Sequence, residues 1–100
     1  AYRRAASANR KSTAALWAIA DLYIQQNSVV EAIVQYRQII DINPEDAEAY
    51  FALGKALATQ QRQDEAIKNL EQAEKLYNRA GNSKGLTETR TLLEKVKGKK

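Results

Sequence analysis

The chain has 100 residues and a formal net charge of +4, with 44% hydrophobic and 28% charged residues. This length allows one small domain, and this composition excludes a disordered chain. No cysteine or histidine is present, which excludes disulfides, thiolate metal sites and the commonest catalytic base. The longest uncharged stretches, such as 12–20, are far too short to span a membrane. The absence of cysteine does not determine the cellular compartment, and we favour the cytoplasm.

Apolar residues recur at three- and four-residue steps along the chain, a spacing that predicts helices. Leu16, Ile19, Ala20 and Tyr23 form the first such face. No segment alternates with a period of two for long enough to indicate a strand, so the predicted fold class is all-α. In chain order, the helices are expected near residues 13–26, 29–42, 46–60, 63–79 and 84–97.

Residues that favour helix ends support most of these boundaries. Ser28 and Glu31 fit a capping box, and Asn43 followed by Pro44 fits an N-cap with proline at the first helical position. Gly81 is suited to a helix C-terminus, and Asn82 or Ser83 can begin another helix. The segment 60–63 lacks a good turn residue, and a short turn is placed there only because the spacing of the helices requires it.

The pattern repeats after 34 residues. Glu31-Ala32-Ile33 recurs as Glu65-Ala66-Ile67, and side-chain volume is preserved where identity is not. Small Ala20 aligns with Gly54, for example, and Ala32 and Ala66 are expected to face this pair across each hairpin. Small residues let antiparallel helices approach closely, so we interpret Gly54 as a packing position.

This pattern resembles the tetratricopeptide repeat (TPR) family, whose unit pairs two helices around a W-x₂-L-G-x₂-Y…A-x₃-F…P pattern. The first unit meets it with Leu16, Ile19, Ala20, Tyr23, Ala32, Tyr36, Ile39 and Pro44, and the second with Tyr50, Leu53, Gly54, Leu57, Ala66, Leu70, Ala73 and Asn78. Leu16, Ile39 and Asn78 depart from the pattern. Asn78 in place of proline predicts a final hairpin helix that continues to about Arg79.

The resemblance implies a solenoid of stacked helix hairpins. Residues 13–46 and 47–80 are expected to be full repeats, and residues 81–97 a capping helix followed by a basic tail, 98–100. Residues 1–12 are interpreted as the end of a preceding repeat, because Tyr2 and Ala5 align with Tyr36 and Ile39 after one period. A degenerate N-terminal cap is the alternative. The chain is therefore expected to be part of a longer protein.

Catalysis, metal binding and cofactor binding are not expected. Residues 81–85 match the G-x-S-x-G string of serine hydrolases, but that motif needs a preceding strand and a histidine. The acidic residues Glu45, Asp46 and Glu48 fit the start of a helix better than a metal site. Phosphate-binding glycine motifs are absent from the sequence.

Nucleic-acid binding is also unlikely on the charge pattern. The net charge is +4 for residues 1–12, −4 for 13–46, zero for 47–80 and +4 for 81–100. The two basic segments would lie at opposite ends of a solenoid, whereas nucleic acid needs one continuous basic face. The basic tail is interpreted as a solubilising segment.

The resemblance places a peptide-binding groove on the first helix of each repeat. The expected groove residues are Trp17, Asp21, Ile24, Gln25, Glu48, Phe51, Lys55 and Thr59. Trp17 and Phe51 would serve as aromatic anchors, although the two rings could instead pack on each other. Clamp-type repeats of this family hold a terminal carboxylate with lysines, asparagines and an arginine. The corresponding positions of this chain carry Trp17, Asp21, Phe51, Lys55, Gly85 and Thr89. A dicarboxylate-clamp ligand is therefore not expected.

Two functions remain. In the first, the chain is a non-enzymatic scaffold that binds a peptide segment or helix of a partner protein, of mixed apolar and polar character, in the groove. In the second, the chain is a structural segment whose uncapped N-terminal edge stacks on further repeats or on another copy, because exposed apolar faces drive association.

Overall fold

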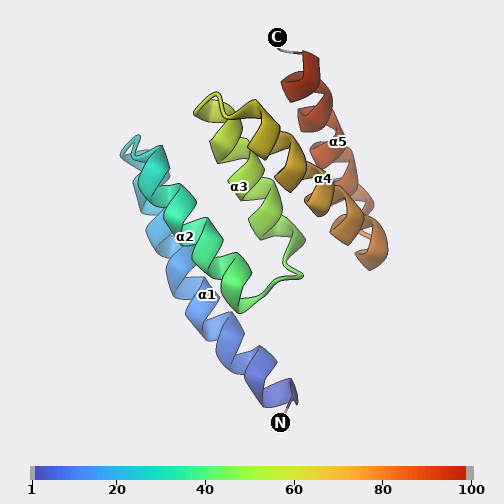
Figure 1. The fold of residues 1–100 in the computed structure, drawn as a ribbon. Coiled ribbons are helices and arrows are strands. Elements are labelled where there is room, and N and C mark those ends of the chain that lie inside the picture. Colours follow the sequence, from blue (N-terminus) through green and yellow to red (C-terminus); the bar gives the residue numbers. More distant parts are fainter. Residues whose placement is uncertain (1, 99–100) are drawn as a thin grey trace.

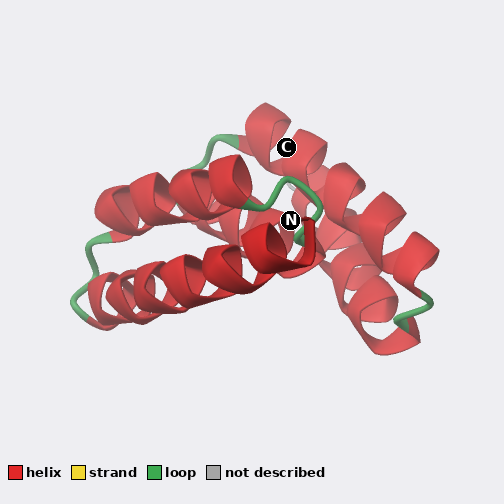
Figure 2. Cartoon of the chain, turned by 90° about the horizontal axis from the view of Figure 1, so that it is seen from below, coloured by secondary structure: helices red, strands yellow, loops and turns green. Residues whose placement is uncertain are grey.

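The computed structural model describes the backbone of residues 2–98 and the side chains of residues 13–98. The described residues form five helices and no strand: α1 (Tyr2–Gln25), α2 (Val29–Ile42), α3 (Ala47–Thr59), α4 (Gln63–Ala80) and α5 (Ser83–Gly98). Each helix packs on the next one in the chain, and α3 also contacts α5. The result is an all-α solenoid of stacked antiparallel hairpins (Figure 1) joined by short loops (Figure 2).

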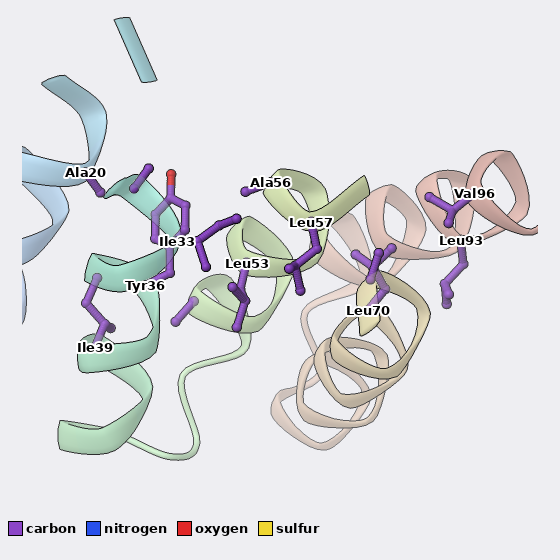
Figure 3. Packing of buried hydrophobic residues seen from close by; sticks show 13 residues of the cluster. Ala20, Ile33, Tyr36, Ile39, Leu53, Ala56, Leu57, Leu70, Leu93 and Val96 are labelled. Carbon is purple, nitrogen blue, oxygen red and sulfur yellow. The ribbon is translucent and has the colours of Figure 1, made fainter. Parts of the chain in front are cut away.

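One continuous core runs through the stack. Figure 3 shows its side chains in sequence, from Ala20 on α1 through Ile39 on α2 and Leu57 on α3 to Leu70 on α4 and Leu93 on α5. All five residues are buried. Because the same core is shared by neighbouring hairpins, the repeats support one another rather than folding around separate interiors.

Small residues set the distance between the helices of each hairpin, as the sequence predicts. Ala20, Ala32 and Ala66 are completely buried. A Cβ atom added to Gly54 would lie 2.7 Å from Cγ of Leu70 and 3.2 Å from the carbonyl oxygen of Ala66. The interpretation of Gly54 as a packing position is therefore confirmed.

The two hairpin turns adopt the same conformation 34 residues apart. Asn27 and Gln61 have φ values of 65° and 62°, in the left-handed region. The following N–H groups each donate back to the preceding helix, from Ser28 to the Tyr23 carbonyl at 2.7 Å and from Arg62 to the Leu57 carbonyl at 2.9 Å. The turn that the spacing requires at 60–63 thus forms without glycine, with Gln61 in a conformation that non-glycine residues adopt at a cost.

The helix caps differ in part from those predicted. Ser28 precedes α2 but its side chain makes no capping hydrogen bond, so the predicted capping box is wrong. Asn43 ends α2 instead of beginning α3, and the N-cap of α3 is Asp46, whose Oδ1 accepts from the Ala49 N–H at 3.2 Å. The residues between them form the turn, which moves the start of α3 three residues past Pro44. Gly81 ends α4 in the left-handed conformation, as predicted.

Helix α1 begins well before the expected boundary at residue 13. It runs from Tyr2 to Gln25 without interruption. If residues 1–12 ended a preceding repeat, a turn would separate them from the helix that begins near residue 13. The segment before Ser12 has several alanines and no glycine or proline, so nothing in it terminates a helix. The side chains of Tyr2 and Ala5, and residues 99–100 of the basic tail, lie outside the described residues.

Helix α5 closes the stack in a register shifted by two residues. Thr89 and Leu93 of α5 are buried, as their counterparts Leu53 and Leu57 of α3 are. Each α5 residue follows its α3 counterpart by 36 residues instead of 34. The shift arises because α4 has 18 residues and α2 only 14, whereas the turn after α4 has two residues and the turn after α2 has four. The 34-residue spacing therefore places residues correctly on α1 and α3 but not on α5.

Candidate groove on the face of α1, α3 and α5

Seven of the eight predicted groove residues line one hollow. This first hollow has a volume of about 430 Å³ and lies between α1, α2 and α3. Its lining includes Trp17, Asp21, Ile24, Glu48, Phe51, Lys55 and Thr59. Gln25 is exposed on α1 but does not line the hollow. The 34-residue spacing brings these side chains together because α1 and α3 occupy equivalent places in successive hairpins.

The aromatic contact in this hollow joins Trp17 to Tyr36, not to Phe51. The two ring centroids lie 5.6 Å apart with the planes tilted by 55°, a favourable arrangement for an aromatic pair. Trp17 and Phe51 are each partly buried against the core. Both aromatic side chains therefore have one side held by the protein and another facing the hollow.

Five further residues line the first hollow and were not predicted from the sequence: Asn27, Val29, Tyr36, Ala52 and Ala56. Tyr36 was assigned only to the hairpin core, where it is indeed buried. Burial raises the pKa of the Tyr36 hydroxyl above its ordinary value, and the nearby Asp21 carboxylate raises it further. Tyr36 carries a hydroxyl where the repeat pattern has phenylalanine, and this polar atom is the signal in the sequence that distinguishes it from the other core residues of the helix.

A second hollow lies between α3 and α5 and adjoins the first at Phe51, Lys55 and Thr59. One part, of about 210 Å³, is lined by Lys55, Ala58, Thr59, Gln63, Leu92, Lys95 and Val96. The other part, of about 310 Å³, is lined by Phe51, Lys55, Thr87, Glu88, Thr91, Leu92 and Lys95. Lys55 lines all of these hollows, so they are neighbours along the face formed by α1, α3 and α5, and together they are called here the groove.

The shifted register of α5 changes which of its residues face the groove. Gly85 and Thr89, placed there by the 34-residue spacing, do not line either hollow. Thr89 is completely buried and its hydroxyl donates to the Gly85 carbonyl at 2.7 Å. Gly85 packs so closely on Tyr77 that an added Cβ would lie 2.5 Å from the ring. Lys95 takes a place in the groove that the sequence analysis did not assign.

Comparisons with known proteins agree with this architecture. The family described as TPR repeat matches residues 20–61, and the family described as tetratricopeptide repeat matches residues 47–79. The chain belongs to the TPR family. A TPR repeat-containing protein of Picosynechococcus sp. is 31% identical over 67 residues, which are 67% of this chain and 17% of that protein. The chain thus spans about a sixth of that relative's length.

Solved TPR structures have the same fold. A solution NMR structure of a tetratricopeptide repeat domain protein from Salinibacter ruber superposes with a TM-score of 0.81 at 22% identity, covering 88% of this chain and 89% of that one. A crystal structure of a tetratricopeptide repeat domain protein from the same organism gives 0.80 at 22% identity, covering 88% and 99%. TPR repeats are generally protein-interaction scaffolds, and proteins of the family are generally non-enzymatic.

The charged residues of this TPR chain divide into paired and unpaired sets. Four ion pairs, Arg37–Glu65, Arg62–Glu65, Arg90–Glu74 and Lys97–Glu71, have separations between 2.9 and 3.6 Å, and none of their residues lines the groove. Within the described part of the chain, the groove residues Asp21, Glu48, Lys55, Glu88 and Lys95 form no ion pair. The groove therefore presents charges that a ligand can neutralise.

Neither a metal-ligand group nor a helix that could span a membrane is found among the described residues. Among them, no group of three or more acidic side chains could hold a metal ion. None of the described helices has the length and apolar character needed to cross a bilayer. The G-x-S-x-G string lies at the α4–α5 turn, where Gly81 ends one helix and Oδ1 of Asn82 accepts from the Gly85 N–H at 3.0 Å. Its residues shape a helix boundary instead of following a strand.

Proposed function

We propose that this TPR chain is a non-enzymatic scaffold that binds an extended segment or a helix of a partner protein in the groove. The observation that carries the proposal is that the two neighbouring hollows share Phe51 and Lys55 as lining residues. A single ligand segment can fill both hollows while it contacts three helices. Trp17 and Tyr36 supply the aromatic part of the surface, and Asp21 and Lys55 supply charges beside it.

This composition suits a binding surface. Aromatic side chains contribute large contact areas at interfaces and are frequent among the residues that dominate binding energy. Trp17 and Phe51 are already partly fixed by the core, so they lose little conformational entropy when a ligand covers them. A groove this short forms a small interface, which favours a dissociation constant of about 1 μM, or about −8 kcal/mol.

Selection from a random twelve-residue peptide library displayed on phage tests the proposal. The wild-type chain should enrich a family of peptides, and Phe51→Ala should weaken binding of a selected peptide by about tenfold. Lys68→Glu is the matched control, because Lys68 is exposed on α4 and lines neither hollow. Circular dichroism should show equal helicity for all three proteins. Enrichment of no peptide, or binding that is unchanged in Phe51→Ala, would refute the proposal.

A second candidate function, stacking through the N-terminal edge, is favoured by one specific observation. Ile19 and Leu22 on α1 are 40% and 55% exposed, whereas Leu53 and Ala56, 34 residues later, are 4% and 5% exposed beneath α2. The same face of the repeat is thus covered at one place in the stack and open at the other. In this candidate, a helix of a neighbouring repeat or of another copy covers Ile19 and Leu22.

Sedimentation over a range of concentrations tests this second candidate. Self-association through α1 should raise the apparent mass as the concentration rises, and replacing both Ile19 and Leu22 with lysine should abolish the increase. Val34→Lys serves as the control, because Val34 is an exposed apolar residue on α2. A constant monomer mass for the wild-type chain would refute stacking between copies.

A further inference from the structure

Two lysines from different helices border the same part of the groove. Lys55 on α3 and Lys95 on α5 line both parts of the second hollow, together with Leu92. Neither lysine forms an ion pair within the described residues, although Lys97, two positions from Lys95, pairs with Glu71. Lys55 and Lys95 therefore bring two positive charges to one hollow with no ion-pair partner among the described residues.

We propose that Lys55 and Lys95 form a subsite for the side-chain carboxylate of an internal acidic residue in the bound segment, next to an apolar residue that contacts the aromatic side chains of the first hollow. The inference rests on the proposed function, since it names the chemistry of the segment that the groove binds. Two unpaired ammonium groups beside one hollow repel each other, and a carboxylate between them removes that repulsion.

The surroundings of the two lysines suit a ligand that combines a charge with apolar groups. Lys55 and Lys95 are exposed, and Leu92 and Val96 provide an apolar wall beside them. The side-chain amide of Gln63 lines the same hollow and can donate to a carboxylate oxygen. An acidic side chain would thus meet two positive charges and one neutral donor.

The position of Lys55 favours an internal residue over a chain terminus. Lys55 borders both hollows, so a segment that fills the whole groove passes over it and continues on either side. A terminal carboxylate at this place would leave one hollow empty. The acidic group is therefore expected to be a glutamate or aspartate side chain within the segment.

Charges of opposite sign lie on opposite sides of the groove along α3 and α5. Glu48 lines the first hollow and Glu88 lines the second, each near the start of its helix, whereas Lys55 and Lys95 lie in the second halves of α3 and α5. Burial raises the pKa of Tyr77, and the carboxylates of Glu48, Asp46 and Glu88 raise it further, which shows that negative charge gathers there. A carboxylate on the ligand is attracted to the side of the groove that carries Lys55 and Lys95 and repelled from the side that carries Glu48 and Glu88.

The composition of the selected peptides tests the inference. Peptides enriched by the wild-type chain should carry a glutamate or aspartate within a few residues of a large apolar residue, at an internal position. A protein that combines Lys55→Glu with Lys95→Glu should instead enrich peptides with lysine or arginine at that position, and Lys68→Glu should reproduce the wild-type pool. A wild-type pool rich in apolar residues without an excess of acids would overturn the subsite but not the groove. Failure to enrich any peptide would overturn both.

Titration of one enriched peptide, made with acetylated and amidated ends, measures the effect. Trp17 is the only tryptophan in the chain and lines the groove, so its fluorescence reports binding without a label. Replacing the peptide's glutamate by glutamine should raise the dissociation constant about fivefold, and Lys95→Glu should raise it about tenfold. The difference between the two peptides should shrink as salt is added. Equal affinity of the glutamate and glutamine peptides would overturn the subsite.

Discussion

The close approach of α3 and α4 at Gly54 allows one substitution to be analysed in detail. In Gly54→Ala, the new methyl group would lie 2.7 Å from Cγ and 2.9 Å from Cδ2 of Leu70, and 3.2 Å from the Ala66 carbonyl oxygen. Leu70 is completely buried, so its side chain has no open space into which it can turn. The helices must therefore separate by several tenths of an ångström, or Leu70 must leave its preferred rotamer.

Two opposing effects decide the magnitude. Alanine within a helix is more favourable than glycine by about 1 kcal/mol. Overpacking of a filled core costs about 1–3 kcal/mol. Because the clash involves a fully buried branched side chain and a backbone oxygen, we expect the upper part of that range and a net loss of about 1–2 kcal/mol in the free energy of unfolding. In a domain of this size, this loss lowers Tm by roughly 5–15 °C.

Urea denaturation followed by circular dichroism measures the change. Gly98→Ala is the matched control, because Gly98 is helical and nothing would meet its added Cβ within 4 Å. Leu70→Ala destabilises either protein by opening a cavity, but the loss should be smaller when it accompanies Gly54→Ala, because the clash disappears. An increase in stability for Gly54→Ala, or a double-mutant cycle without coupling, would refute the packing explanation.

Other substitutions test the turns and the buried tyrosines. Gln61→Gly should stabilise the chain by about 0.5–1 kcal/mol, since Gln61 adopts a φ of 62°, and Asn27→Gly should gain less. Gly81→Ala should cost about 1 kcal/mol in urea denaturation, because Gly81 ends α4 with a φ of 71°. The raised pKa values of Tyr36 and Tyr77 mean that the unfolded chain loses these protons first, so the contribution of the two tyrosines to stability should be constant below about pH 10 and fall above it. Replacing both tyrosines by phenylalanine should reduce the fall in the free energy of unfolding above about pH 10. An unchanged dependence of that free energy on pH would contradict the role of the two tyrosines.

The hairpins could be predicted from the sequence because they depend on local patterns. The spacing of Leu16, Ala20 and Tyr23 indicates a helical face, and the match between Ala20 and Gly54 indicates where helices come close. The 34-residue period then places Trp17 and Phe51 on the same side of successive hairpins. These inferences need only the periodicity and the side-chain volumes, both of which can be read directly from the sequence.

The remaining features depend on tertiary packing. Gln61 adopts a left-handed conformation that its own preference disfavours, because the flanking helices determine the turn. The longer α4 and the shorter turn that follows it together shift α5 by two residues, which buries Thr89 and brings Lys95 to the groove. Tyr36 belongs to the core and also lines the first hollow. The periodicity of the sequence does not show which core residues also line a hollow. The 34-residue period therefore brings the predicted residues of α1 and α3 to one hollow, whereas it does not place the residues of α5.

The most direct test of the groove is a map of backbone amide NMR shifts during titration with a selected peptide. The proposed function predicts that the shifts concentrate on the residues of α1, α3 and α5 that line the two hollows, including Phe51 and Lys55. Shifts concentrated instead on the outer side of α4 around Lys68, with the groove residues unmoved, would contradict it.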